Sequence, residues 1–450
     1  MKIMLCARKF KSPLVGGVDV YAERMGRALM KLGHSVSIIA VDSTAVNQNG
    51  TIAVSEDTHE AMNVFRLQFA FNGRPKEAFD NAYDPEMGSA IHRILQQQKP
   101  DLFIVLNFYI TTLAAVKVAK ALHIPVIHIA TDFLPVCRRA TLMHENGTPC
   151  HDGESIKSCA TCFVSHHVLG RVAASVLNQL PEARLVAWGG KRDSGGVLLP
   201  LRVFNPYWKQ VAIMAQRLQT LQPLREQIDL VFAPTQYTRN AFLENGFSLE
   251  QVHFLPFGVE EDHPLTQVSS VPAPHIRFLF IGRLQPYKGA HLLLEAFNNL
   301  ASAQNATLTI YGTADGYEEY YEQLQAMMAL NKRVHFGGKI APDELGQAFA
   351  EADYFILPST WHENSPLIVL DALQSKTPVI ASDIGGVRDI VQDGINGLLF
   401  PMGDVQALQR VLQKAIDQPS LVEQFQGGVH LPSIDSYVGT MLQRFEDIRV

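Results

Sequence analysis

Two cations lie close together in the segment GRLQPYKG, at Arg283 and Lys288. The segment directly follows the strand-like run RFLFI, so the sequence places both side chains at the carboxyl edge of a parallel sheet, where open α/β sheets bind ligands. Fixed cations there suit a diphosphate, because they stabilise the negative charge that grows as a diphosphate leaves. A solvated basic loop is the alternative. Because Gly282 and Gly289 frame the two charges, the ligand site is favoured.

Two carboxylates follow in the segment ENSPLIVLDAL, at Glu363 and Asp371. A helix would separate these positions by about 12 Å along its axis, which is too far for a paired acid and base. They could instead hold two ends of an extended ligand, Glu363 a sugar hydroxyl and Asp371 a ribose diol. From these two residues alone, a helix N-cap carboxylate followed by an ordinary exposed acid is the better explanation.

Backbone amides are the other groups that could bind a ligand. The segment 363–367 offers free amides at a helix start, except at Pro366, and these suit sugar hydroxyls or phosphate oxygens. Near the N-terminus, the loop that ends in Gly16 and Gly17 lies between a first strand and a first helix, where amides can approach a phosphate. That loop lacks the G-x-G-x-x-G spacing, so a glycine turn needed only for chain reversal is about as consistent.

The elements that position these residues follow an α/β pattern. Apolar runs such as KIMLCA, SVSIIAV, DLFIVL and PVIHIA alternate with segments of helical period, which is typical of parallel sheets. The alternation restarts after the polar stretch DHPLTQVSSVPAPH. We therefore expect two domains, at residues 1–265 and 275–430, with a last helix at about 432–450 that packs back on the first domain.

Bulk composition limits the classes of function. A chain of 450 residues with 47% hydrophobic residues can bury two cores. With 18% charged residues and a net charge of -6, no strong field draws nucleic acid by charge alone, so we expect no nucleic-acid partner. The sequence shows no secretory signal and no apolar run of about 18 residues, and we expect a cytoplasmic protein.

The second domain resembles a retaining glycosyltransferase of the GT-B fold, specifically the large family 4. Six motifs in the family's order carry the resemblance: GRLQPYKG, TIYGTADG, VHFGGKI, DYFILPSTWHENSPLIVLDAL, TPVIASDIGG and DGINGLLF. The first domain is similar through GGVDVY, TDFLPVCRR, and APTQYTRNAFLENGF leading to LPFGVE. The resemblance implies two Rossmann-like, doubly wound domains that face each other across a cleft. It also implies a UDP- or GDP-linked sugar as donor, bound mainly on the second domain.

The resemblance further assigns roles to single residues. Arg283 and Lys288 would contact the diphosphate and Glu363 would lie near the sugar, and no catalytic cofactor is implied because the two cations replace a divalent metal. Asp371 would bind the ribose, although the family usually has Glu at this position. The donor-binding residues implied in this way are Gly16, Gly17, Gly312, Lys339, Ile340, Asn364, Ser365, Pro366, Leu367 and Asp371.

Four cysteines are clustered with the spacing C-x12-C-x8-C-x2-C, at Cys137, Cys150, Cys159 and Cys162. Similar cysteine-containing loops occur in a subset of the family. Four thiolates would close a tetrahedral, structural zinc site, which a reducing compartment favours over disulfides. Cysteines that pack or stay free are an equal alternative, given the long first spacing.

One departure from the family lies at Thr131, which precedes Asp132 where relatives often have His. His128 is three residues earlier on an apolar strand, and we expect it to be a hydrogen-bonded core residue. Residues 204–225 mix aromatic, apolar and basic positions and could touch a lipid-linked saccharide at the inner membrane face. An amphipathic helix that covers a core is the more frequent explanation of such a stretch.

The resemblance implies front-face transfer of the sugar to a saccharide or lipid-linked acceptor with retained anomeric configuration, in cell-surface polysaccharide or glycoconjugate synthesis. A nucleotide-sugar epimerase on the same fold is an alternative, since fold does not fix chemistry. The Thr131 and Asp371 departures also leave open a catalytically silent sugar-nucleotide binder.

Overall fold

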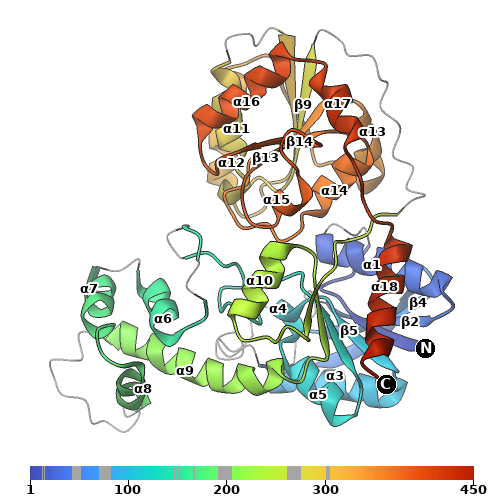
Figure 1. The fold of residues 1–450 in the computed structure, drawn as a ribbon, viewed down its shortest axis with the longest axis vertical. Coiled ribbons are helices and arrows are strands. Elements are labelled where there is room, and N and C mark those ends of the chain that lie inside the picture. Colours follow the sequence, from blue (N-terminus) through green and yellow to red (C-terminus); the bar gives the residue numbers. More distant parts are fainter. Residues whose placement is uncertain are drawn as a thin grey trace.

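The computed structural model describes residues 1–449, apart from residues 13, 15, 43–51, 70–82, 145–146, 151–152, 166–167, 191–204, 261–274 and 301–304. The expected boundary between the two domains, at residues 265–275, lies almost entirely outside these described residues. The described chain contains two separate sheets, which Figure 1 shows in blue to green and in yellow to red.

The first unit is built on an eight-stranded sheet with the strand order β3-β4-β2-β1-β5-β6-β7-β8. Neighbouring strands are parallel except β3 and β4, which are antiparallel at one edge. All residues of β5, β6 and β7 are buried, as expected for strands that are covered on both faces. The strands are β1 (Lys2–Cys6), β2 (Ser35–Asp42), β3 (Ala53–His59), β4 (Met62–Gln68), β5 (Leu102–Val105), β6 (Val126–Ile129), β7 (Leu230–Ala233) and β8 (Val252–Phe254).

Helices cover both faces of this sheet. Ile3 and Leu5 belong to a core that includes α1, whereas Met4 and Cys6 belong to a second core that includes α3 and α5, because successive side chains of a strand point to opposite faces. The helices of these layers are α1 (Gly17–Lys31), α3 (Pro85–Gln98), α4 (Phe108–Thr111), α5 (Ala114–Ala121) and α10 (Gln236–Glu244).

Four helices form an arm that projects from the first unit (Figure 1). The arm has its own small core, in which Tyr207 and Trp208 are almost fully buried. The stretch 204–225 is therefore, over its described part, a helix that covers a core, which confirms the second of the two explanations given for it. The arm consists of α6 (Ile156–Val164), α7 (Val168–Leu177), α8 (Glu182–Gly190) and α9 (Asn205–Arg225).

The second unit has a six-stranded, fully parallel sheet with the order β11-β10-β9-β12-β13-β14. The two parallel sheets confirm the predicted α/β fold class. The strands are β9 (Ile276–Ile281), β10 (Ala306–Tyr311), β11 (Val334–Gly338), β12 (Tyr354–Leu357), β13 (Val379–Ser382) and β14 (Gly397–Phe400). The helices are α11 (Ala290–Asn298), α12 (Glu318–Ala329), α13 (Leu345–Ala350), α14 (Leu367–Gln374), α15 (Val387–Ile390), α16 (Val405–Asp417) and α17 (Leu421–Gly427), with 3-10 turns η4 (Pro286–Lys288) and η6 (Pro342–Glu344).

The last helix, α18 (Ile434–Asp447), returns to the first unit and packs against α1 (Figure 1). Tyr437 and Phe445 of this helix are buried in the core that contains α1. The crossing requires a glycine at residue 258, because a Cβ atom there would lie 2.5 Å from the backbone of Ile434. Within the described part of the chain, no helix has both the length and the apolar character that crossing a bilayer needs.

Candidate active site between the two sheets

The loop after β9 carries the two cations that the sequence singled out. Arg283 is exposed and Lys288 is half-buried at the end of η4. Gly289 follows with a φ of 74°, and a Cβ atom there would lie 1.9 Å from the carbonyl oxygen of Pro358. Only glycine fits this close approach, so the position of Lys288 depends on the residue after it.

Lys288 and Glu363 are brought together although they are far apart in the sequence. The Nζ atom of Lys288 lies 2.6 Å from Oε1 of Glu363, and the hydroxyl of Ser359 donates to the same oxygen at 3.0 Å. Glu363 is only 7% exposed, and a buried carboxylate needs such partners. The structure therefore joins two of the three predicted catalytic residues in one charged pair at the carboxyl edge of the second sheet.

The segment 363–367 bends tightly before α14 begins. The amide of Gly386 donates to the carbonyl of Glu363 at 2.8 Å, and a Cβ atom on Gly386 would lie 1.8 Å from the carbonyl oxygen of Asn364. The glycines of the DIGG motif therefore serve chain geometry. No side chain caps the N-terminus of α14, where Pro366 occupies the N-cap position.

The first unit closes directly over this segment. The side chain of Asn364 donates to the carbonyl of Ala130 and accepts from the hydroxyl of Thr238. A Cβ atom on Gly17 would lie 3.7 Å from Leu367, so these two predicted donor residues face each other from different units. The predicted residues therefore meet at the junction of the two sheets.

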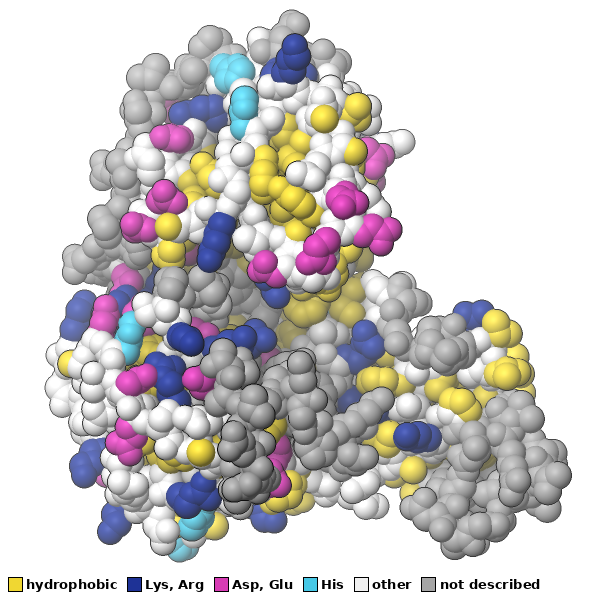
Figure 2. Space-filling model, turned by 180° about the vertical axis from the view of Figure 1, so that it is seen from behind, with side chains coloured by type: hydrophobic (Ala, Val, Ile, Leu, Met, Phe, Trp, Pro, Cys, Tyr) yellow, Lys and Arg dark blue, Asp and Glu magenta, His cyan; other side chains and the backbone are white. Residues whose placement is uncertain are grey.

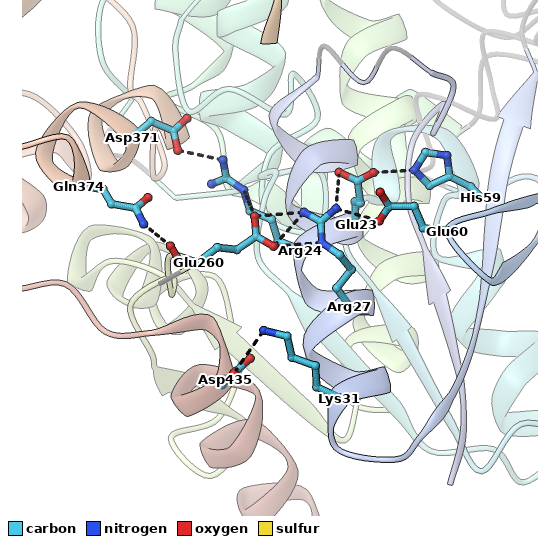
Figure 3. A network of polar contacts seen from close by, with 10 residues as sticks. All are labelled: Glu23, Arg24, Arg27, Lys31, His59, Glu60, Glu260, Asp371, Gln374 and Asp435. Atoms are coloured by element: carbon cyan, nitrogen blue, oxygen red, sulfur yellow. Dashed lines mark hydrogen bonds and ion pairs between the residues drawn. The ribbon is translucent and has the colours of Figure 1, made fainter. Parts of the chain in front are cut away.

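Asp371 contacts an arginine of the first unit, as Figure 3 shows. The Nη2 atom of Arg24 on α1 lies 3.0 Å from Oδ1 of Asp371, and its Nε atom lies 3.6 Å from Glu260. Both Arg24 and Asp371 are buried, at 5% and 9% exposure. Ribose binding by Asp371 stays a prediction, and the contact that the structure gives its Oδ1 atom is an ion pair between the two units.

Sequence reasoning missed Arg24, although a signal for it existed. Arg24 stands among apolar residues on the buried side of α1, next to Met25 and one turn from Tyr21 and Ala28. An arginine on the buried side of a helix needs an acidic or carbonyl partner.

Glu260 extends the contact into a network around α1 (Figure 3). Arg27 donates to Glu260 through Nε at 3.0 Å and through Nη2 at 2.8 Å. The side chain of Gln374, one turn after Asp371 on α14, donates to the backbone carbonyl of Glu260. The network joins α1 to α14 through the last described residue before the linker.

The remaining predicted donor residues lie at strand ends of the second sheet. A Cβ atom on Gly312 would lie 2.1 Å from the carbonyl oxygen of Gly282, so the loops after β9 and β10 touch through their backbones. Lys339 and Ile340 directly follow β11, with Lys339 exposed and Ile340 packed against an apolar cluster. Ser365 is half-buried beside Pro366.

The β1–α1 loop is fixed by an acid that sequence reasoning did not single out. Asp19 is buried and accepts hydrogen bonds from the amides of Arg8 at 2.9 Å and Lys9 at 3.1 Å. Burial raises the pKa of Asp19, while these backbone amides act against the shift. Gly16 is the N-cap of α1, with no side-chain cap.

The Thr131-Asp132 segment turns its side chains toward nearby backbone. Asp132 accepts from the amides of Phe108 and Leu134, each at 2.8 Å, and Thr131 donates to the carbonyl of Leu106.

His128 is fully buried with Nδ1 2.9 Å from the carbonyl oxygen of Val105, and burial lowers its pKa to about 4. The prediction that His128 is a core residue is confirmed.

The four clustered cysteines all lie in the part of the chain that the structure describes. They form no disulfide, and no three of their sulfurs lie within 4.8 Å of one another. In the part of the chain that the structure describes, the one group of metal-binding side chains that is this compact is Glu23, His59 and Glu60, where Arg27 already lies 2.8 Å from Glu60. The zinc site stays a prediction.

Two domain families match the chain, one on each side of the linker. Residues 16–194 match the glycosyl transferase 4-like domain, and residues 265–427 match glycosyl transferases group 1.

Curated relatives match over part of their length. The D-inositol 3-phosphate glycosyltransferase of Streptomyces griseus is 27% identical over 201 residues, which is 41% of this chain and 42% of that protein. The sulfoquinovosyl transferase of Arabidopsis thaliana is 36% identical over 131 residues, which is 28% of this chain and 24% of that protein. The chain thus spans less than half the length of these two relatives.

Solved structures share the whole fold. The sucrose-phosphate synthase of Thermosynechococcus elongatus superposes with a TM-score of 0.65 at 17% identity, covering 100% of this chain and 99% of that one. Anabaena HepE, solved in complex with UDP, has a TM-score of 0.65 at 16% identity and covers 99% of this chain and 100% of that one. The chain therefore has the two-domain fold of these structures, and it carries a region that matches the glycosyl transferase 4-like domain followed by a region that matches glycosyl transferases group 1.

Proposed function

We propose that the protein is a retaining glycosyltransferase that moves a sugar from a nucleotide diphosphate sugar to a saccharide or lipid-linked acceptor. The observation that carries this proposal is the ion pair of half-buried Lys288 with buried Glu363 at the carboxyl edge of the second sheet, with Arg283 on the same loop as Lys288. A cation held by a carboxylate and framed by a required glycine has a fixed position, which is what stabilisation of a leaving group needs.

In this mechanism the donor diphosphate contacts Arg283 and Lys288. As the bond between the anomeric carbon and the phosphate oxygen breaks, negative charge grows on the diphosphate, and the two cations stabilise it more than they stabilise the bound donor. Lys288 binds both the diphosphate and the carboxylate of Glu363, and Glu363 also accepts a hydrogen bond from a sugar hydroxyl. Amides at the N-terminus of α14 add donors for phosphate oxygens.

The acceptor hydroxyl attacks the anomeric carbon from the face that the diphosphate leaves. Its oxygen forms the new glycosidic bond, and its proton passes to the departing phosphate oxygen, so no separate base is needed. This agrees with Asp371 being paired with Arg24 and therefore a poor candidate for a general base. The substituent returns to the same face, so the anomeric configuration is retained.

The nucleotide and the acceptor are proposed from chemistry and fold. Anabaena HepE, which shares the fold, has been solved with UDP and with UDP-glucose, so UDP-sugars are the first donors to test and GDP-sugars the second. We place the reaction in cell-surface polysaccharide or glycoconjugate synthesis, with the protein cytoplasmic and peripheral at the inner membrane face.

Nucleotide release from a panel of UDP- and GDP-sugars, followed by mass spectrometry of the product, tests the activity. Arg283→Ala is expected to lower turnover about 100-fold, because one donor to the developing charge is lost, with unchanged thermal unfolding because Arg283 is exposed. Arg410→Ala, which removes an exposed arginine on α16, is the matched control. Equal turnover of the Arg283 variant and the wild type would overturn the mechanism.

A catalytically silent sugar-nucleotide binder is the second candidate. Thr131 favours a silent binder, because its hydroxyl donates a hydrogen bond to the carbonyl of Leu106 and it has no titratable group. Tight donor binding in calorimetry without nucleotide release for any acceptor would support this candidate. Release of an altered sugar without any acceptor would instead indicate an epimerase.

A further inference from the structure

Helix α7 of the arm carries an unusual apolar face. Among the twelve large hydrophobic side chains that are exposed in the described part of the chain, four lie on this one ten-residue helix. They are Val168, Leu169, Val172 and Val176, with exposures of 66%, 58%, 47% and 53%. Scattered exposed hydrophobic residues are ordinary, but a contiguous group of them marks a contact surface.

The four side chains form one stripe. At about 100° per residue, positions 168, 169, 172 and 176 fall within an arc of roughly 100° on the helix. The opposite side packs into the core of the arm through Ala173, Ala174 and Leu177. Gly170 approaches α6 so closely that a Cβ atom would lie 2.4 Å from the carbonyl oxygen of Val164. The helix is therefore held in place with its apolar stripe facing outward.

The arm is also basic, although the chain as a whole is acidic. In the described part of the arm's helices, Lys157, Arg171, Arg184 and Lys209 are exposed or half-buried, and Glu182 is the one exposed acid. The whole chain, in contrast, contains 38 Lys and Arg and 44 Asp and Glu. Arg171, exposed on α7, flanks the apolar stripe, and Figure 2 shows hydrophobic and basic side chains beside one another on the arm. A basic segment in an acidic chain complements an anionic surface.

We propose that the outer face of α7 docks the protein on an anionic lipid bilayer. A single convex helix with aliphatic residues on one stripe and cations beside it fits the headgroup boundary, where apolar side chains insert and cations meet anionic lipids. A protein partner would more often be met by aromatic anchors in a pocket, and the aromatic residues Tyr207 and Trp208 of the arm are buried. The proposal deepens the proposed function, because it names the surface that brings the enzyme to a membrane-borne acceptor.

The docked arm is linked to the cleft through a buried ion pair. Glu154 binds Arg217 at 2.5 Å and also Arg225, and Arg217 donates to the carbonyl of Leu134, two residues after Asp132. The side chains of Glu154 and Arg217 are at most 1% exposed. These contacts join α9 of the arm to the segment that follows Asp132, so docking through α7 brings that segment close to the bilayer.

Vesicle sedimentation of the full-length protein tests the proposal. We expect binding to phosphatidylcholine vesicles that contain phosphatidylglycerol, weaker binding at high salt because surface charges are screened, and little binding to pure phosphatidylcholine. The double variant Leu169→Asp with Val172→Asp is expected to lower the bound fraction at least 10-fold. Leu330→Asp, at a site that is 80% exposed at the end of α12, is the matched control and should bind like the wild type.

Three results would overturn the proposal. The first is a wild-type protein that does not bind the anionic vesicles, and the second is an α7 variant that binds them as well as the wild type does. The third is a wild-type dimer in light scattering that the α7 variant dissociates, without vesicle binding, which would make the stripe a contact between copies. Donor turnover with a water-soluble acceptor is measured in parallel, and we expect it to be unchanged in the α7 variant, so a failed docking surface and a failed transferase assignment are told apart.

Discussion

Single residues show how burial sets charge in this protein. His128 is fully buried between the rings of Phe108 and Phe242, with centroid distances of 4.5 and 5.7 Å. Burial disfavours the imidazolium form, which is why the pKa falls to about 4. The histidine is therefore neutral at physiological pH and packs as part of the sheet.

This shift predicts a pH dependence of stability. The folded state resists protonation of His128 until about pH 4, whereas the unfolded chain takes up a proton near pH 6.5. The contribution to stability is complete above pH 6.5 and falls as the pH drops toward 4, by up to about 3 kcal/mol. Denaturant unfolding at pH 7 and at pH 4.5 measures this change in the free energy of unfolding. The change should be smaller in His128→Gln. An equal change in that variant would assign the effect to other groups.

The ion pair of Arg24 and Asp371 predicts strong coupling between the two units. Removing either side chain takes the nearest opposite charge away from a buried charged group, which costs about 3 kcal/mol, whereas removing both costs less than the sum. A double-mutant cycle with Arg24→Ala and Asp371→Ala, followed by thermal unfolding, measures the coupling. The exposed pair Lys31 and Asp435, 3.7 Å apart, gives the reference, for which we expect less than about 1 kcal/mol. Additive effects at Arg24 and Asp371 would contradict the coupling.

At the scale of elements, the loop between β9 and α11 depends on one glycine. Gly289 combines a φ of 74° with a 1.9 Å approach to Pro358, whereas Gly403 has a φ of 75° and open space around its Cβ position. The two glycines therefore separate the effect of backbone strain from the effect of steric overlap.

We expect Gly289→Ala to displace the loop that carries Lys288 and to lower nucleotide release at least 100-fold. Gly403→Ala should cost only about 1 kcal/mol of stability, the strain of a non-glycine residue at positive φ, and leave turnover intact. Circular dichroism confirms that both variants are folded before their turnover is compared. Full activity of Gly289→Ala would contradict this prediction, because it would show that Lys288 keeps its position without a glycine at residue 289.

The elements differ in how far the sequence could predict them. Strands such as β5 and β9 are short apolar runs between glycine, proline and polar residues, and their alternation with helices predicts the parallel sheets. Lys288 and Glu363 come together because they follow β9 and β12, which are parallel neighbours and end at the same edge of the sheet. The pairing of Arg24 with Asp371 could not be predicted, because it depends on how two units are placed relative to each other, and no local period records that. The stripe on α7 has helical spacing like a core face, and only the structure shows which side is covered.

At the scale of the whole molecule, the C-terminal helix α18 belongs to the first unit although the second unit precedes it in the sequence. Its residues Tyr437, Met441 and Phe445 are at most 1% exposed and complete the core under α1. The core of the first unit is therefore built from two parts of the sequence that lie on either side of the second unit.

A substitution in α18 is expected to weaken the first unit selectively. Phe445→Ala removes a buried ring and should cost about 3 to 5 kcal/mol, while Ile448→Ala, at a site that is 49% exposed, should cost little. Hydrogen exchange resolved by peptide should show faster exchange in α1 and β1 and unchanged exchange in β9 and α11. Faster exchange in both sheets would mean that the units unfold as one.

The chain passes between the units twice, and the two passages are bonded to each other. The amide of Val259 donates to the carbonyl of Pro432 at 2.9 Å, and the amide of Ile434 donates to the carbonyl of Val259 at 2.8 Å. Two chain crossings that are hydrogen-bonded to each other join the two units along one edge. A relative rotation of the units about this edge would change the distance between the two sheets least near residues 259 and 432–434 and most on the opposite side.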